Sequence, residues 1–145
     1  MRSAHRGAGL LFALSAACVM TLSGTVQASA ADPTATWTLS QTEQRICVAP
    51  ERGWPDTYYL ASVTGSSESP IDHAIRELPS GSFSNGGTIH PGELNPSGKF
   101  LGFGHISIAP APVGEYIAQL WASDGTSTQT APLRISVKED CLSGT

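Results

Sequence analysis

The chain has 145 residues, of which 14% are charged, and a formal net charge of −4 at pH 7. Its eight Lys and Arg residues are scattered along the sequence. Binding to nucleic acid or attack on an anionic membrane needs such residues in clusters. The composition therefore argues against both classes of function.

The first thirty residues have the parts of a secretory signal peptide. Two arginines lie in the first six residues, "GAGLLFALSAACVMTLSG" is an apolar stretch, and Ala28-Ser29-Ala30 fits the A-x-A cleavage pattern. We expect residues 1–30 to be cleaved and residues 31–145 to form a single secreted domain, with no membrane attachment after cleavage.

Two other interpretations of this segment stay open. An uncleaved membrane anchor is one, although Ser, Thr and Gly interrupt the apolar stretch after Met20. A lipoprotein anchored at Cys18 is the other, although Ser15 stands where a lipobox has a large aliphatic residue.

Cys47 and Cys141 are the cysteines of the expected mature chain. An exported chain with an even number of cysteines favours disulfides, and two cysteines allow one intramolecular pairing. Two free thiols or half of a metal site are the alternatives, but neither cysteine has a Cys or His at ligand spacing. We expect a Cys47–Cys141 disulfide, no metal site and no cofactor.

The mature chain is interrupted by Gly, Pro, Ser and Thr about every 8 to 12 residues, which is typical of a sandwich or barrel of short strands. "ERGWPD" is expected to be a turn. Strands are expected at "ATWTLS" (35–40), "QRICVAP" (44–50), "TYYLASVTG" (57–65), "IDHAIREL" (71–78), "FLGFGHISIAP" (100–110), "GEYIAQLWAS" (114–123) and "APLRISVKED" (131–140).

Two stretches are less regular. Residues 71–78 alternate apolar and polar positions, but their apolar positions also fit one face of a short helix. Residues 79–98 are expected to be the longest loop, with one short strand near Thr88–Ile89 and a mobile tip at Ser84–Gly87.

The C-terminal half resembles bacterial immunoglobulin-like modules. "APAPVGEYIAQLWASDGTSTQTAPLRISV" is similar to their proline-glycine turn, tyrosine, strand, "DG" turn and final strand, and "ELPSGS" is similar to their "LPxG" turn. The likeness covers residues 71–137 and implies a tyrosine corner at Tyr116. Ala118 stands where antibody domains place a Cys, so the expected disulfide departs from their pattern. We therefore expect an all-β, immunoglobulin-like antiparallel β-sandwich of seven or eight strands, closed by one disulfide.

The whole chain also resembles a family of small secreted proteins of uncharacterised function from high-GC Gram-positive bacteria. That resemblance implies no known activity and no known site residues.

Catalytic motifs are absent from the sequence, which has no G-x-S-x-G, H-E-x-x-H, P-loop or G-x-G-x-x-G. Glu115 and Asp124 stand at opposite ends of one expected strand, about 30 Å apart, so they cannot form an acid–base pair. His73, His90 and His105 lack metal-ligand spacing and are expected to be a half-buried strand residue, a loop residue and an outward strand residue. We expect no enzymatic activity; a hydrolase with a site not visible in sequence is an alternative.

Three aromatic residues are candidate binding residues. Trp121 is expected to point outward from its strand, and Trp54 lies in a turn near Tyr58. Exposed aromatic rings anchor protein interfaces or stack on sugars, whereas packing against the sandwich is the alternative role of Trp121. We expect a secreted domain that binds an extracellular or cell-envelope partner, a protein or a polysaccharide. The alternative is a small secreted enzyme inhibitor that uses the loop 79–98.

Overall fold

The computed structural model describes residues 35–40, 43–93 and 98–142. The expected signal peptide and Cys18 lie outside these residues. The described residues contain no helix of the length and apolarity that a membrane crossing requires. Their strands are β1 (Trp37–Leu39), β2 (Gln44–Val48), β3 (Trp54–Gly65), β4 (Ile71–Arg76), β5 (Phe83–Ile89), β6 (Lys99–Ile108), β7 (Gly114–Ser123) and β8 (Thr128–Val137).

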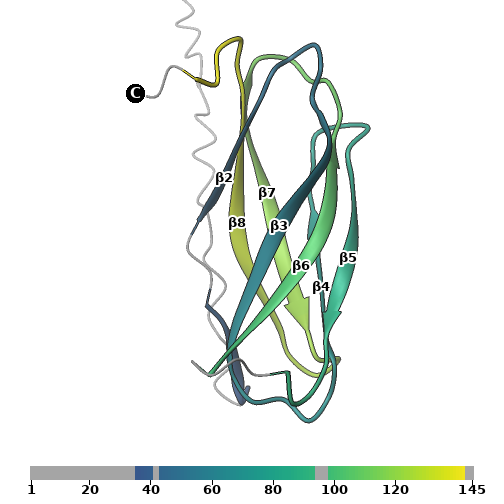
Figure 1. The fold of residues 1–145 in the computed structure, drawn as a ribbon, viewed down its shortest axis with the longest axis vertical. Coiled ribbons are helices and arrows are strands. Elements are labelled where there is room, and N and C mark those ends of the chain that lie inside the picture. Colours follow the sequence, from purple (N-terminus) through teal and green to yellow (C-terminus); the bar gives the residue numbers. More distant parts are fainter. Residues whose placement is uncertain (1–34, 41–42, 94–97, 143–145) are drawn as a thin grey trace, which may run out of the picture.

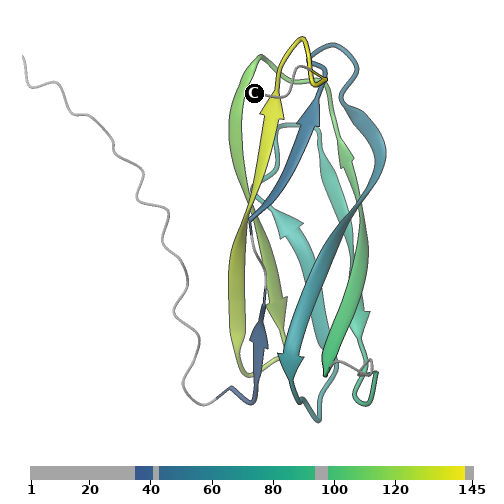
Figure 2. The ribbon, with the colours of Figure 1, turned by 60° about the vertical axis from the view of Figure 1, so that its left-hand side comes forward.

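These eight strands form one sheet in the order β1-β3-β6-β5-β4-β7-β8-β2. Neighbouring strands are antiparallel, except that β2 runs parallel to β8. The sheet is continuous because β5 pairs with both β6 and β4. It curls into a half-barrel, so that β3 and β6 lie across the core from β7 and β8 (Figures 1 and 2). The expected all-β class is confirmed.

The core lies inside this curled sheet and is built from alternate residues of each strand. In β8, Leu133, Ile135 and Val137 are buried on the inner face. Other large side chains with almost no exposure are Trp37, Tyr59, Ile71, Ile106, Ile108 and Leu120. Residues 71–76 also alternate as a strand, which settles the choice between strand and helix there.

A buried histidine–tyrosine pair lies within the core. The Tyr59 hydroxyl lies 3.0 Å from Nδ1 of His73 and donates to the His73 carbonyl at 3.1 Å. Gly102 and Gly104 of β6 leave the space for these rings, because a Cβ at either glycine would overlap one of them. Burial lowers the pKa of His73 and raises the pKa of Tyr59 to about 12. The expectation of a half-buried His73 is therefore wrong, since 1% of the residue is exposed.

The expected long loop at 79–98 is wrong for residues 83–89, because β5 occupies Phe83–Ile89. This strand includes the short strand expected near Thr88–Ile89, and residues 94–97 lie outside the described residues. The expected mobile tip lies within this strand, at a bulge between Ser84 and Gly86. The Ser84 hydroxyl accepts a hydrogen bond from the backbone N–H of Ile75 in β4 at 3.2 Å. Asparagine and glycine have low strand propensity, but pairing with neighbours on both sides forms the strand here.

The turn at "ERGWPD" is shorter than expected, because β3 already begins at Trp54. Gly53 donates to the Ala49 carbonyl at 2.9 Å and has a φ of 60°, in the region that favours glycine. The turn therefore closes at Gly53, and Trp54 belongs to the strand.

The strands β1 and β2 are consecutive in the chain but lie at opposite ends of the sheet order. Gln129 of β8 joins the two ends of the sheet through its side chain. Its Nε2 donates to the Trp37 carbonyl at 2.8 Å, and its Oε1 accepts from the Leu39 N–H at 2.9 Å. Two outward backbone groups of β1 are thereby satisfied without a neighbouring strand.

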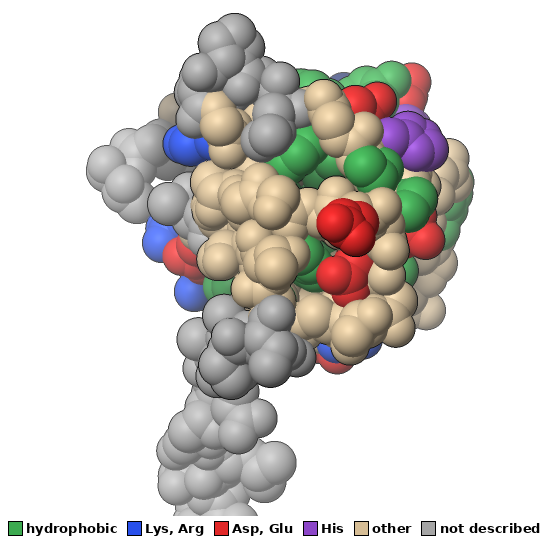
Figure 3. All heavy atoms as spheres, turned by 90° about the horizontal axis from the view of Figure 1, so that it is seen from below, with side chains coloured by type: hydrophobic (Ala, Val, Ile, Leu, Met, Phe, Trp, Pro, Cys, Tyr) green, Lys and Arg blue, Asp and Glu red, His purple; other side chains and the backbone are tan. Residues whose placement is uncertain are grey.

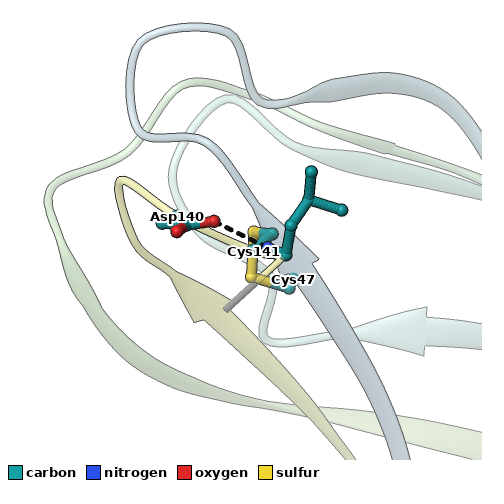
Figure 4. Close-up of a disulfide and its surroundings, with 4 residues drawn as sticks. Cys47, Asp140 and Cys141 are labelled. Atoms are coloured by element: carbon teal, nitrogen blue, oxygen red, sulfur yellow. Dashed lines mark hydrogen bonds between the residues drawn. A yellow bond between two sulfur atoms is a disulfide. The ribbon is translucent and has the colours of Figure 1, made fainter. Parts of the chain in front are cut away.

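The expected disulfide is confirmed. Cys47 of β2 is bonded to Cys141, which follows β8, and their Cα atoms are 5.7 Å apart (Figure 4). Beside the bridge, the Leu142 N–H donates to an Asp140 carboxylate oxygen at 2.8 Å. The bridge thus ties the C-terminal tail to an early strand.

The expected tyrosine corner and the turn before β8 are both present. The Tyr116 hydroxyl donates to the Pro112 carbonyl at 2.9 Å, four residues upstream. In the turn, Oδ1 of Asp124 accepts from the N–H groups of Thr126 and Ser127 at 2.9 and 2.7 Å. Its Oδ2 accepts from Nε1 of buried Trp37 at 2.7 Å. These hydrogen bonds, the one from Ser127 first, lower the pKa of Asp124.

Candidate functional site

The three aromatic residues singled out in the sequence do not come together. Tyr58 is 65% exposed on the outer face of β3. Trp54 is 45% exposed and borders a recess of about 440 Å³ beside the Cys47–Cys141 disulfide. Trp121 is half-buried on β7, at the other wall of the half-barrel. Trp54 and Tyr58 thus share β3, whereas Trp121 lies on another wall, and whether any of the three binds a partner stays a prediction.

Instead, Tyr58 belongs to a strip of exposed apolar side chains on three neighbouring strands. Phe103 and Leu101 of β6 are 66% and 47% exposed, and Phe83 of β5 is 52% exposed. Leu60, half-buried, lies opposite Phe103 in the pairing of β3 with β6. We call Tyr58, Phe83, Leu101 and Phe103 the apolar face. In Figure 1, β3 and β6 cross in front of β7 and β4.

His105 connects the members of the apolar face. Its ring meets Tyr58 edge-on at 5.7 Å between centroids and lies 6.3 Å from the ring of Phe83. Its Nε2 lies 2.5 Å from a carboxylate oxygen of Asp56. This ion-pair partner holds the imidazole between Tyr58 and Phe83, so that these three rings lie together on the outer face.

An Asp–His pair is also part of hydrolase active sites, where the second ring nitrogen bonds a nucleophile. In the described residues, Nδ1 of His105 is buried and has no hydrogen-bond partner. Asp56 and His105 therefore hold no serine or threonine hydroxyl in a triad. What this pair does in the structure is orient an aromatic ring between Tyr58 and Phe83.

The other outer wall, formed by β4, β7, β8 and β2, is polar. Arg134 bonds Glu43 at 2.7 Å and lies 3.7 Å from Glu115. The hydrogen bond from Arg134, with a second from Arg45, lowers the pKa of Glu43. Nearby, Arg76 donates to the Gln119 amide oxygen at 2.6 Å. The two walls thus differ: one carries the arginine ion pairs, and the other carries the apolar face with the Asp56–His105 pair beside it.

The end of the half-barrel at the β3–β4 and β7–β8 turns is polar as well. A recess of about 320 Å³ opens there, lined mainly by serine and threonine hydroxyls together with Glu68 and Asp124. Figure 3 looks onto this end and shows acidic side chains beside other side chains and backbone, with some hydrophobic side chains between them. The described residues include no group of three or more His, Cys, Asp or Glu that could hold a metal ion.

Sequence reasoning missed most of the apolar face because both faces of "FLGFGHISI" look suitable for a core. The outward column holds Leu101, Phe103 and His105, while the inward column holds Gly102 and Gly104 between larger residues. The period-two run of Leu101 and Phe103 was a usable signal. Because His105 was expected to point outward, the same period of two would have placed Leu101 and Phe103 beside it on the outer face. Only the structure explains the glycines between them, since the rings of His73 and Tyr59 fill the space there.

The fold and this face define a small, disulfide-bridged, all-β domain with one apolar and one polar wall. The chain belongs to a family of unknown function (DUF5980), whose model matches residues 38–139. No curated protein matches the chain.

Among solved structures, the chain is similar to "Structure of Vibrio cholerae VesB protease", with 12% identity and a TM-score of 0.38. The match covers 66% of this chain and 30% of that one, so the chain spans less than a third of that protein's length. A likeness of this size is too weak to inform either fold or activity.

Proposed function

We propose that this protein is a secreted, non-enzymatic binding domain that docks an extracellular protein on its apolar face. The observation that carries the proposal is the contiguous exposure of Tyr58, Phe83, Leu101 and Phe103 on three adjacent strands. Monomeric soluble proteins rarely leave large apolar side chains together in water, and such patches mark interaction sites. Aromatic residues are also enriched among those that dominate interface energies.

The chemistry of the face favours a protein over a polysaccharide. Phe83, Leu101 and Phe103 offer no hydrogen-bonding groups, whereas sugars need polar partners for their hydroxyls. Polar groups gather at one end of the strip, where Asp56 and His105 already bond each other. A protein surface with its own apolar side chains fits this distribution better.

Secretion and an immunoglobulin-like architecture are part of the same proposal. The disulfide is compatible with an oxidising, extracellular location. The tyrosine corner at Tyr116 supports an immunoglobulin-like relationship. So does the edge formed by β1 and β2, which pair with β3 and β8 respectively. The inhibitor alternative has less support, because β5 replaces residues 83–89 of the expected loop.

The test is capture of envelope and culture-supernatant proteins by the purified, oxidised protein, followed by mass spectrometry. The variant Phe103→Glu places a charge in the apolar face. Ile117→Glu is the matched control, because Ile117 is 38% exposed on the polar wall. We expect a protein that the wild type and Ile117→Glu capture equally and that Phe103→Glu loses. Both variants should unfold at the wild-type temperature, since neither side chain is buried.

Insoluble cell wall, chitin and cellulose form the second arm of this test. Retention on one of them that depends on Tyr58 and Phe103 would replace the protein partner with a polysaccharide. Capture that Phe103→Glu leaves unchanged would remove the apolar face from the binding function altogether.

A further inference from the structure

The apolar face has opposite charges at its two ends. At one end Asp56 bonds His105, near the level where Thr57 pairs with Ile106. At the other end Lys99 begins β6, opposite Thr64 of β3. These ends are separated by about eight residues of extended strand, or about 27 Å. Phe103, among the most exposed members of the face, stands midway between them.

We infer that the apolar face also pairs two copies of this chain in a symmetric, antiparallel dimer. The inference rests on the proposed docking role of the face and names a second copy as its occupant when no other protein is bound. The two-fold axis lies in the interface and crosses the strands at the level of Phe103. It stacks β6 on the partner's β6 in the opposite direction.

This arrangement is self-complementary. Phe103 meets the partner's Phe103 at the axis, and Leu101 faces the level of the partner's Tyr58. Lys99 reaches the end that holds the partner's Asp56, and the reverse pair forms by symmetry. A Lys ammonium has three donors, so this contact adds to any that Lys99 makes within its own chain. Closed two-fold interfaces require such matching of one patch with itself.

The size of the face predicts weak pairing. Three strands about 4.8 Å apart span about 14 Å, and the strip is about 27 Å long. That footprint is about 380 Å² per copy, or about 760 Å² in total, which is below the standard size of specific interfaces, so we expect the association to be weak and transient. Packed sheets lie about 10 Å apart, with strands within about 30° of alignment, so the antiparallel stack is sterically ordinary. A weak dimer shields the apolar side chains from water, and a protein that binds the apolar face more tightly displaces the second copy.

Sedimentation equilibrium of the purified, oxidised protein tests this, over about 1 μM to about 1 mM to cover weak association. We expect the average mass to rise toward that of two chains. Phe103→Glu should weaken the pairing at least about tenfold, as loss of an interface anchor does, and Ile117→Glu should leave it unchanged. A protein that stays monomeric throughout, or whose pairing ignores Phe103→Glu, overturns the inference.

Two further variants test the geometry. Phe103→Cys should give a disulfide-linked dimer under mild oxidation, because residue 103 meets its own copy at the axis; Ile117→Cys should not. Lys99→Glu should weaken pairing, and adding Asp56→Lys should restore it, although Asp56→Lys also removes the bond to His105. Cross-linking at both cysteines alike, or no response to Lys99→Glu, contradicts the antiparallel stack.

The outcomes separate the two proposals. If the protein is monomeric but captures another protein through Phe103, the dimer is wrong and the binding function stands. If it pairs through Phe103 but captures nothing, the dimer stands and the separate partner is wrong.

Discussion

The side chain of Gln44 in β2 forms two hydrogen bonds with the backbone of Leu60 in β3. Its Nε2 donates to the Leu60 carbonyl at 2.9 Å, and its Oε1 accepts from the Leu60 N–H at 3.0 Å. The pairing of β1 with β3 covers Val63 to Gly65 and stops short of Leu60. The Gln44 amide therefore makes the two backbone hydrogen bonds that a neighbouring strand would make at this edge.

Replacing Gln44 with Ala should lower the free energy of unfolding by about 1–3 kcal/mol, because the N–H and C=O of Leu60 both lose their partner. Urea denaturation measures the change. Gln119→Ala is the matched control, since that amide bonds Arg76 on the exposed wall and should cost well under 1 kcal/mol. An equal loss of unfolding free energy in both variants would show that the hydrogen bonds of Gln44 do not stabilise this edge of the sheet.

The buried imidazole of His73 should make stability depend on pH. Burial lowers its pKa from the ordinary value of 6.5, so the folded state favours the neutral ring. Its core neighbours are the Tyr59 phenol and glycines of β5 and β6, and the nearby carboxylate is that of exposed Asp72. Below pH 6.5 the unfolded chain binds a proton that the folded chain resists.

We therefore expect full stability above about pH 6.5 and a loss of at most about 1.4 kcal/mol per pH unit below it. Chemical denaturation at several pH values between 4.5 and 8 measures the slope. In His73→Gln the slope between pH 5 and 6.5 should shrink, whatever the absolute stability of the variant. If the unfolding free energy of His73→Gln still depends as steeply on pH, another group causes the pH dependence.

Gly104 is required by the packing of Tyr59. A Cβ at this position would overlap the phenol ring, which is buried in the core. We expect Gly104→Ala to destabilise the fold by about 1–3 kcal/mol through overpacking. Gly114→Ala serves as the control, because its nearest neighbour would be an ordinary contact of 3.8 Å with Tyr116. Thermal unfolding measures the melting temperatures of the two variants. Equal melting temperatures for Gly104→Ala and Gly114→Ala would contradict this account.

Removing the Cys47–Cys141 bridge should cost about 2–5 kcal/mol, because it closes a long loop in the unfolded chain. The bridged residues are 94 positions apart. The double variant Cys47→Ser/Cys141→Ser, compared with the oxidised protein in guanidinium, gives this value. Reduction of the wild type should reproduce it, and a negligible difference in both would mean that the tail adds nothing to stability.

Much of the fold could be predicted from local patterns. In β7 and β8 each strand follows from strict alternation between turns that carry Pro, Gly or Asp. The tyrosine corner at Tyr116 and the Asp124 turn are short-range features, so four or five residues suffice to specify them. The disulfide followed from counting, because two cysteines allow one pairing.

The candidate site could not be predicted in the same way, because it depends on neighbours distant in sequence. Ser84 and Gly86 form a strand only through pairing with β6 and a hydrogen bond to β4. Which column of β6 faces water depends on Tyr59 and His73, whose rings need the glycines inside.

The amino-acid sequence alone therefore determined the all-β class, most strand positions and the bridge, since these depend on alternation, turns and cysteine count. The curling of the sheet decided the rest. It placed Trp121 on a different wall from Tyr58, and it placed Phe83, Leu101 and Phe103 on one exposed wall. The reason is that a surface is a property of strand order and packing, which single-strand periodicity does not contain.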